Sequence, residues 1–217
     1  MEQKTDSGND ARRLRQAFII MLSFTLLLWT VKLVEYFGGL DLSWLGIYPR
    51  LLDGLAGVLS APLVHGSFAH LFANTAPLIV IGTLLLYGYP RASRILLPAV
   101  YLLGGFAVWL FAREAYHIGA SGLVFGMLFF LLTVGILRWD RRAIALSLMV
   151  FFLYGGMIWG VLPESREISF ESHLSGAVIG ILLAFLLRKR DPEPPRKQYS
   201  WECEDADDDD FEWPDRL

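Results

Sequence analysis

The sequence has 217 residues, of which 54% are hydrophobic, and its formal net charge at pH 7 is −3. The mean hydropathy is +0.45, and several apolar blocks are long enough to cross the roughly 30 Å hydrocarbon core of a bilayer as a helix, which excludes a soluble globular protein. Cys203 is the only cysteine, so an intramolecular disulfide is excluded as well.

A polar N-terminal segment, residues 1–16, precedes the first apolar block. That block predicts a first membrane span at about 17–37. It is too long for the apolar region of a signal peptide, and no small-residue cleavage site follows it, so we expect no cleavage there. Lys32 and Glu35 lie three residues apart near its outer end. They predict an ion pair on one helical face, with the lysine head group extending to the membrane surface.

The next stretch, residues 38–64, is interrupted by glycines and prolines but is rich in leucine. It is too broken for a span and too apolar for a free loop. Trp44 and Tyr48 lie within it, and both residue types favour the membrane interface. The stretch therefore predicts a first loop that is partly embedded in the interface.

Five further spans are predicted at about 69–87, 95–112, 121–137, 143–162 and 171–187. The predicted fold class is therefore all-α, a polytopic bundle of six transmembrane helices, in a membrane domain that extends over residues 17–190. Residues 191–217 contain several prolines and the acidic run from Asp207 to Asp210. We expect them to form a disordered, solvated tail.

The cations are distributed unequally between the joints on the two sides of the predicted bundle. One set of joints contains only Arg50, Arg113 and Arg166. The other set contains twelve cations: Lys4, Arg12, Arg13, Arg15, Arg91, Arg94, Arg138, Arg141, Arg142, Arg188, Lys189 and Arg190. Because positive residues stay in the cytoplasm, this asymmetry predicts that both termini are cytoplasmic and that the even-numbered spans run inward.

Polar residues begin each of the three inward-running spans. His70 and Asn74 begin the second span, Ser121 begins the fourth and His173 begins the sixth. Such groups are costly inside a membrane and mark functional sites. Since the three helices run in the same direction, all four residues are expected at one shallow depth near the outer face.

Small residues follow two of these polar residues at a spacing that allows close helix packing. Gly122 and Gly126 follow Ser121, and Gly176 and Gly180 follow His173. Glycines four residues apart let two membrane helices approach backbone to backbone. The fourth and sixth spans are therefore expected to pack against each other and to bring the Ser121 hydroxyl toward the His173 imidazole.

A serine paired with a base is the minimal activated nucleophile. We expect no Asp or Glu near these positions in an inward-running span, so we predict a Ser121–His173 dyad without an acidic third member. Acyl transfer also requires donors for the negative oxygen of the tetrahedral intermediate. The side-chain amide of Asn74, an N–H of His70 and the backbone N–H of Ser121 are the predicted donors.

Three motifs carry a resemblance to a known family. They are His65-Gly-Ser-Phe-Ala-His70-Leu-Phe-Ala-Asn74, Gly119-Ala120-Ser121-Gly122 and His173-Leu-Ser-Gly176-Ala-Val-Ile-Gly180. In this order and on these spans, the motifs resemble those of the rhomboid family of intramembrane serine proteases. The resemblance covers about residues 17–188 and implies the six-helix form of bacterial rhomboids.

The resemblance also implies individual roles. Ser121 is expected as the nucleophile, His173 as the general base, and His65 as a structural histidine that holds the first loop against the core. Gly119 is expected to form the turn beneath the nucleophile. Phe125 falls where the family often has a tyrosine stacked on the catalytic histidine, so the stacking is kept and the hydroxyl is lost.

Two positions depart from the pattern of the family. Many relatives carry an adjacent Trp-Arg pair in the first loop, whereas Trp44 and Arg50 are separated here. The position before the catalytic histidine is often alanine in the family and is Ser172 here.

The activity implied by the resemblance is hydrolysis of peptide bonds in or near transmembrane segments of other membrane proteins. The expected substrates are single-span proteins with small, helix-weakening residues near their outer end, and the gap between the second and fifth spans is the implied lateral route to the site. The expected location is the plasma membrane of a bacterium, as a multi-pass protein. We expect no cofactor, no metal and no nucleic-acid partner; the partners are membrane-protein substrates and the lipid bilayer.

Three alternatives remain open at this stage. The first is a rhomboid-like protein without catalytic activity that binds membrane clients. The second is a metal-dependent protein that uses His65, His70 and His173, although no His-Glu-x2-His motif is present. In the third, His117 serves as the proton carrier; otherwise it is a loop residue.

Overall fold

The computed structural model describes residues 3–163 and 169–193. Within these ranges the chain is helical, and the only β-pairing is an isolated bridge between Ile47 and His117. The long helices are α1 (Gln3–Gly38), α4 (Phe68–Gly88), α5 (Pro90–Phe111), α6 (Ser121–Arg138), α7 (Arg141–Tyr154) and α8 (Phe170–Leu187). Six helical segments, with α7 continued by the 3₁₀ helix η3 (Gly155–Val161), are long and apolar enough to span a membrane. The predicted all-α bundle of six transmembrane helices is confirmed.

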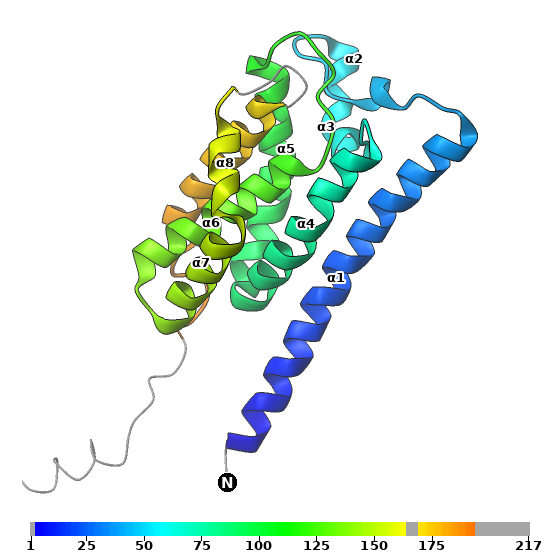
Figure 1. The fold of residues 1–217 in the computed structure, drawn as a ribbon. Coiled ribbons are helices and arrows are strands. Elements are labelled where there is room, and N and C mark those ends of the chain that lie inside the picture. The colour runs from blue at the N-terminus through cyan, green and yellow to red at the C-terminus, as the bar shows by residue number, and fades with distance from the viewer. Residues whose placement is uncertain (1–2, 164–168, 194–217) are drawn as a thin grey trace, which may run out of the picture.

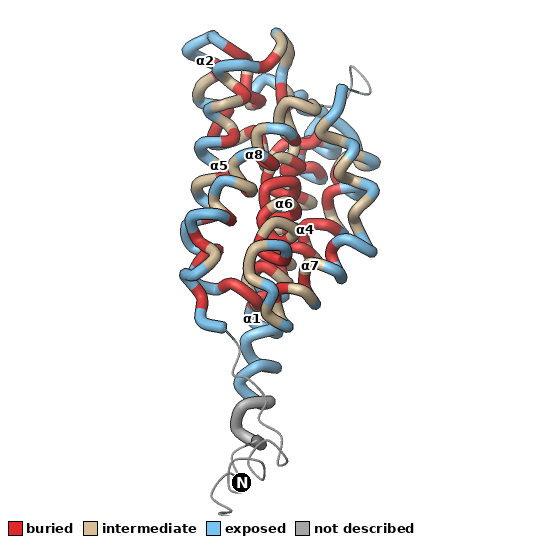
Figure 2. Tube along the Cα trace, turned by 90° about the vertical axis from the view of Figure 1, so that its left-hand side faces the viewer, coloured by how far each residue is buried: buried red, intermediate tan, exposed pale blue. Residues whose placement is uncertain are grey.

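Helix α6 lies at the centre of the bundle. Figure 2 shows it buried along most of its length, whereas the other long helices each keep an exposed side. Leu128, Phe130 and Val134 on this helix are fully buried. Such a helix is apolar on all sides because protein surrounds it, whereas the outer helices present their exposed apolar side chains to lipid.

Glycines set the close contact between α6 and α8. A Cβ atom added to Gly176 would overlap the carbonyl oxygen of Gly122, and one added to Gly180 would overlap that of Gly126. The two backbones therefore touch along one face of each helix, which confirms the packing predicted from the glycine spacing.

The first loop folds into short helical pieces: η1 (Ser43–Leu45), α2 (Leu52–Leu55), α3 (Gly57–Ser60) and η2 (Ala61–Leu63). Figure 1 shows these pieces at the upper end of the bundle, beside α5. Tyr101 and Trp109 of α5 donate hydrogen bonds to loop carbonyl oxygens, at 2.6 Å to Leu59 O and 2.8 Å to Leu51 O. Side-chain donors of a membrane helix thus satisfy backbone groups of this interrupted segment, which would otherwise be costly to bury.

Lys32 and Glu35 form the predicted ion pair, with 2.8 Å between Nζ and Oε2. The expectation that the lysine extends to the membrane surface is wrong, because its side chain is only 10% exposed. Lys32 Nζ also lies 3.4 Å from the carbonyl oxygen of Gly66, and Glu35 accepts a hydrogen bond from the backbone of Leu42 at 3.3 Å. A buried charge pair needs such additional hydrogen bonds, and here they connect α1 to both ends of the first loop.

The segment after α8 is ordered at its start. Asp191 is 3% exposed, and its carboxylate accepts hydrogen bonds from the backbone N–H groups of Arg91 and Ala92 at 2.8 and 2.9 Å. It thereby caps the N-terminus of α5, and Arg138 Nη1 donates to its carbonyl oxygen at 2.8 Å. The predicted start of a disordered tail at residue 191 is therefore too early. Residues 194–217, which hold the acidic run, lie outside the described residues.

Candidate active site

Ser121, His173 and His70 lie in the first turns of α6, α8 and α4, and Asn74 lies in the second turn of α4. These three helices begin at the same end of the bundle, which we call the site end (Figure 1). Because the three helices run in the same direction, the predicted candidate residues lie at a similar depth in the bundle. Ser121 and His173 are each 8% exposed and Asn74 is 4% exposed, so the groups are largely withdrawn from solvent.

The His173 imidazole is held by contacts on two sides. Its Nδ1 lies 2.8 Å from the carbonyl oxygen of Gly160 in η3. Because a carbonyl can only accept, Nδ1 carries the proton, and the neutral ring keeps Nε2 as a proton acceptor. Phe125 stacks on the ring with centroids 4.1 Å apart and planes at 6°. This stacking contact is the one that the resemblance to the rhomboid family implied.

Gly160 contacts His173 through its backbone, a contact that the sequence analysis missed. A Cβ atom at this position would lie 2.9 Å from Phe125 Cζ and 3.4 Å from His173 Nδ1. The close approach of this backbone to the imidazole therefore depends on the absence of a side chain. The cluster Gly155, Gly156 and Gly160 in the fifth span was the available signal.

The turn before Ser121 also requires a glycine. Gly119 has φ of +107°, and a Cβ atom there would lie 2.6 Å from His70 Cε1 and 2.8 Å from His70 Nε2. An L side chain is disfavoured at this φ and would collide with the imidazole. The residues just before the candidate nucleophile are thus in contact with His70.

Asn74 and His70 interact with each other along α4. One amide hydrogen of Asn74 Nδ2 is donated to the carbonyl oxygen of His70 at 3.0 Å. Ser67 caps this helix, since its Oγ accepts a hydrogen bond from the His70 backbone N–H at 3.0 Å. The second amide hydrogen of Asn74 has no protein acceptor among the described residues, so it can be given to a substrate oxygen.

His65 connects the first loop with the segment before Ser121. It is 1% exposed, and its Nε2 lies 3.5 Å from the backbone N–H of Ala120. Its ring meets that of His70 edge to face, with centroids 5.1 Å apart. Burial, and then the neighbouring His70, lower the pKa of His65 to about 4. A neutral ring in this position fits the structural role that the resemblance implies.

Ser121 Oγ and His173 Nε2 do not meet in a hydrogen bond in this structure. Neither atom has a hydrogen-bond partner among the described residues, although the two helices are in backbone contact at Gly122 and Gly176. In unliganded enzymes, hydrogen bonds between catalytic groups are often long and tighten only when substrate binds.

The sequence profile of the rhomboid domain matches residues 53–190, which include all the residues above. The chain belongs to the rhomboid family. It is 42% identical over 180 residues to an uncharacterised Mycobacterium tuberculosis protein, covering 77% of this chain and 73% of that one. An uncharacterised Mycobacterium leprae protein is 37% identical over 191 residues, or 81% of this chain and 74% of the relative. The Arabidopsis thaliana RHOMBOID-like protein 2 is 32% identical over 151 residues, or 67% of this chain and 44% of the plant protein.

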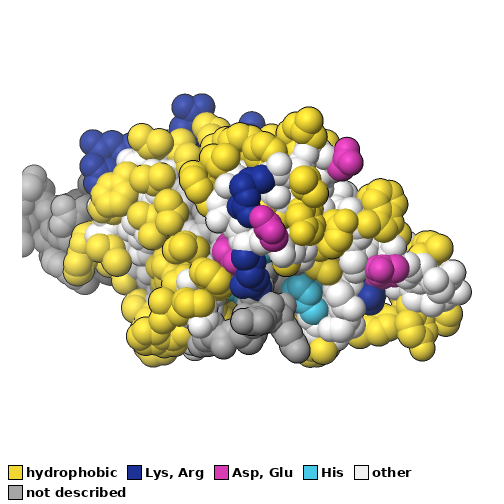
Figure 3. Space-filling model, turned by 90° about the horizontal axis from the view of Figure 1, so that it is seen from above, with side chains coloured by type: hydrophobic (Ala, Val, Ile, Leu, Met, Phe, Trp, Pro, Cys, Tyr) yellow, Lys and Arg dark blue, Asp and Glu magenta, His cyan; other side chains and the backbone are white. Residues whose placement is uncertain are grey.

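A histidine side chain reaches the surface at the site end of this rhomboid (Figure 3). Figure 3 looks down on the end that carries the first loop and shows a histidine at the surface, close to basic and acidic side chains. Hydrophobic side chains cover much of the periphery in the same view. An apolar periphery around polar groups is expected where a membrane-embedded bundle opens to water.

His117 is a scaffold residue in this rhomboid. It is 2% exposed, its Nδ1 lies 2.6 Å from Ser169 Oγ, and its Nε2 lies 2.9 Å from the carbonyl oxygen of Arg113. Its backbone pairs with that of Ile47 in the first loop. Burial lowers the pKa of His117. With both ring nitrogens in hydrogen bonds to protein groups, the geometry favours the interpretation as a loop residue over that as a proton carrier.

The expectation that no acidic residue lies near these positions in an inward-running span is wrong, because Glu171 is in the first turn of α8. It lies two positions before His173 at the start of α8, and its carboxylate forms an ion pair with Arg113 at 3.3 Å. The hydrogen bond of His173 Nδ1 goes to a backbone carbonyl instead of this carboxylate. Among the described residues, the partner of His173 Nδ1 is therefore a carbonyl oxygen and not a carboxylate.

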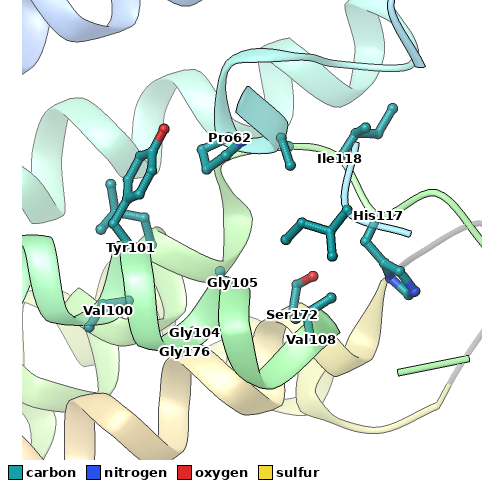
Figure 4. A pocket seen from close by; sticks show the side chains of 15 residues that line it. Pro62, Val100, Tyr101, Gly104, Gly105, Val108, His117, Ile118, Ser172 and Gly176 are labelled. Atoms are coloured by element: carbon teal, nitrogen blue, oxygen red, sulfur yellow. The ribbon is translucent and has the colours of Figure 1, made fainter. Parts of the chain in front are cut away.

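A small cavity of about 40 Å³ lies behind the starts of α6 and α8 (Figure 4). His117 and Ser172 line one side of it, and Pro62 and Tyr101 line another. By volume it has room for about one water molecule, which occupies about 30 Å³ in the liquid. The glycines at 119, 122 and 176 leave this space beside the helix that carries Ser121.

No metal centre is formed by the residues in ranges 3–163 and 169–193. These residues contain no group of three His, Cys, Asp or Glu side chains that is arranged to hold an ion. His65 and His70 are neighbours, but they pack ring against ring. The geometry gives no support to the metal-dependent alternative.

Proposed function

We propose that this rhomboid is an intramembrane serine endopeptidase with Ser121 as nucleophile and His173 as general base. The observation that carries the proposal is the clamp on His173, since the Gly160 carbonyl and the Phe125 ring fix both its tautomer and its plane. This tautomer leaves Nε2 as the proton acceptor on the helix that packs against the helix of Ser121.

The proposed reaction has two stages. Ser121 Oγ attacks the scissile carbonyl carbon while its proton passes to His173 Nε2. The tetrahedral intermediate then collapses, the C–N bond breaks, and the leaving amine takes the proton from His173. Water attacks the acyl-enzyme with His173 again as base, which releases the carboxylate and restores the Ser121 hydroxyl.

The proposed oxyanion donors are the Asn74 amide, an N–H of His70 and the Ser121 backbone N–H. All three groups are at the site end. The free amide hydrogen of Asn74 and the position of His70 beside Gly119 support this assignment.

The proposed substrates are membrane proteins whose transmembrane segments contain helix-weakening residues, because attack requires an extended peptide bond. We further propose the orientation expected from the charge distribution, with the site end outward, both termini cytoplasmic, and the plasma membrane as the location. The proposed lateral route lies between α4 and α7. Exposed aromatic side chains on α7, such as Phe152 at 79%, support a lipid-facing helix there.

One observation is compatible with the alternative of a client-binding rhomboid without catalysis. Ser121 Oγ and His173 Nε2 form no hydrogen bond, and a non-catalytic relative would also tolerate this arrangement. Cleavage activity separates the two functions, because only the protease cuts its bound client.

The test is cleavage of a generic single-span substrate by purified protein in proteoliposomes. Wild type and a Ser23→Ala control, which alters an exposed serine of α1, are expected to cut the substrate. Ser121→Ala and His173→Ala are expected to abolish cleavage while melting at the wild-type temperature. Cleavage by purified Ser121→Ala protein would rule out the proposed nucleophile.

A further inference from the structure

A basic crevice lies at the end of the bundle opposite the site end, where α5 begins; we call this the basic end. The crevice has a volume of about 570 Å³. Four arginines line it: Arg13 from α1, Arg91 and Arg94 from α5, and Arg142 from α7. Asp191 is the one acidic residue in the lining, so the formal charge of the lining is four positive against one negative.

The positive charge of this crevice is not neutralised by the protein that surrounds it. The Asp191 carboxylate is already occupied by the backbone N–H groups at the start of α5. Within residues 3–163 and 169–193, the ion pairs involve Lys32, Arg50, Arg113 and Arg138, and none involves an arginine of the crevice. Arg142 donates to the carbonyl oxygen of Pro192, but its Nε is buried without a hydrogen-bond partner. A multivalent anion is the complementary ligand, because arginine forks bind phosphate oxygens in pairs.

An apolar hollow continues the crevice toward the middle of the bundle. It has a volume of about 420 Å³ and lies between α1 and α5, with Met21 and Phe24 on one side and Leu97 and Leu102 on the other. Ile20 lines both the basic crevice and this hollow. Helix α1 packs mainly on α4, which leaves its side toward α5 open.

The two spaces together have the dimensions of one leaflet. Along α1, eleven residues separate Arg13 from Phe24, a rise of about 16 Å. Half of a hydrocarbon core is about 15 Å thick. Basic pockets between transmembrane helices suit the head groups of anionic lipids, and here such a pocket leads into an apolar groove of matching length.

We propose that an anionic phospholipid binds between α1 and α5, with its phosphate among Arg13, Arg91 and Arg94 and an acyl chain along Ile20, Phe24 and Leu97. In the orientation proposed above, this lipid belongs to the cytoplasmic leaflet. Its binding would connect α1 to α5, two helices that otherwise share little contact.

The acidic run from Asp207 to Asp210 is an alternative anionic occupant of the crevice, from within this chain. Pro192, at the rim of the crevice, precedes it in the sequence. A peptide in the apolar hollow would bury backbone groups without partners at membrane depth, whereas an acyl chain has none to satisfy. The apolar continuation therefore favours a lipid over the chain's own acidic segment.

The experiment measures lipid retention by native mass spectrometry and thermal unfolding of the full chain in detergent, with added phosphatidylglycerol, phosphatidylcholine or soluble glycerol phosphate. We expect phosphatidylglycerol alone to be retained and to raise the melting temperature. Arg91→Gln with Arg94→Gln should weaken phosphatidylglycerol binding roughly 25-fold, at about fivefold for each arginine. Arg91→Lys with Arg94→Lys should keep most of the binding because the charge remains.

Matched controls separate the parts of the site. Arg141→Gln removes an exposed arginine at the same end, outside the crevice, and should leave phosphatidylglycerol binding unchanged. Ile20→Trp fills the junction of the two spaces and should reduce binding, whereas Leu186→Trp on the exposed face of α8 should not. A chain that ends at Glu193 should bind the lipid as the full chain does.

Four results would overturn the proposal. They are equal retention of the two lipids, an equal effect of glycerol phosphate, unchanged binding in the Arg91→Gln/Arg94→Gln protein, and lipid binding that appears only after removal of residues 194–217. The last result would assign the crevice to the acidic segment.

Discussion

At the scale of single residues, the arrangement of the candidate site depends on two glycines as much as on Ser121 and His173. Gly119 lets the chain turn beneath Ser121 against His70, and Gly160 lets a carbonyl oxygen reach His173 Nδ1. A main-chain acceptor of this kind orients the imidazole without adding a buried negative charge, and a buried charge would carry a desolvation cost.

Gly160→Ala should reduce kcat because the new methyl group would contact both the Phe125 ring and the His173 imidazole. Its Cβ would lie 2.9 Å from Phe125 Cζ, so the stack must shift. The matched control is Gly156→Ala in the same 3₁₀ helix, where nothing lies within 4 Å of the added atom. Steady-state kinetics in proteoliposomes should show the loss for Gly160→Ala alone. Equal kcat values for the two variants would remove Gly160 from the positioning role.

Asn74→Ala should lower kcat more than it raises KM, because the second amide hydrogen, which is not donated to His70, is proposed to bind only the developing oxyanion. Loss of one such donor typically costs roughly 10²–10³ in rate, and the two remaining donors make a smaller loss the expectation. Asn74→Asp should be slower still, since it places negative charge beside the oxyanion. Melting curves provide the control. An unchanged kcat with a lowered melting temperature would make Asn74 a structural residue that bonds to His70.

At the scale of elements, the sequence predicted most span boundaries to within a few residues. The structure differs from the prediction in three places, which are the start of α1, the end of the fifth span and the first loop. Helix α1 extends back to Gln3 through polar residues that a hydropathy argument assigns to a separate segment. The fifth span becomes a 3₁₀ helix at Gly155, after which Gly160 meets His173. The first loop consists of helices of three or four residues, too short to show a hydrophobic period.

The residues of the candidate site were predictable for a specific reason. Ser121, His173, His70 and Asn74 are polar groups in apolar helices, where each carries a cost that only packing or function offsets. Gly160 and Asp191 were missed because their contacts involve main-chain groups of distant segments. Such contacts leave no pattern in the local sequence.

Gly176→Ala should destabilise the bundle because the new methyl group would overlap the Gly122 carbonyl oxygen and force α6 and α8 apart. Gly104→Ala on α5 is the matched control, since its added atom would meet only Ile179 Cδ1, at 3.9 Å. The control should be neutral or more stable, by up to about 1 kcal/mol from helix propensity. Thermal unfolding in detergent compares the two. A Gly176→Ala protein as stable as Gly104→Ala would mean that the two helices can separate at little cost.

At the scale of the whole molecule, the two ends of the bundle carry different groups of side chains. The site end gathers the starts of α4, α6 and α8 around Ser121 and His173, and the basic end gathers arginines and the Asp191 cap. Contacts distant in sequence join the elements at both ends, such as His65 with Ala120 and Asp191 with Arg91. The bundle is therefore fixed at its two polar ends as well as along its apolar centre.

Shortening the chain should separate the role of Asp191 from that of the acidic segment. A chain ending at Glu193 keeps the cap on α5 and should melt as the full chain does. A chain ending at Arg190 loses two hydrogen bonds to a buried carboxylate, a loss of roughly 2–3 kcal/mol, and should melt at a lower temperature. Equal melting temperatures for these two shortened chains would show that the cap contributes little.

The most direct test of the central claim is labelling of purified protein with a fluorophosphonate probe, followed by peptide mass spectrometry. Such a probe reacts with a serine whose hydroxyl is activated by a base. The account predicts a single modified residue, Ser121, with labelling lost in His173→Ala and retained in Gly156→Ala. Absence of labelling in the wild type, or labelling of Ser121 that persists in His173→Ala, would contradict it.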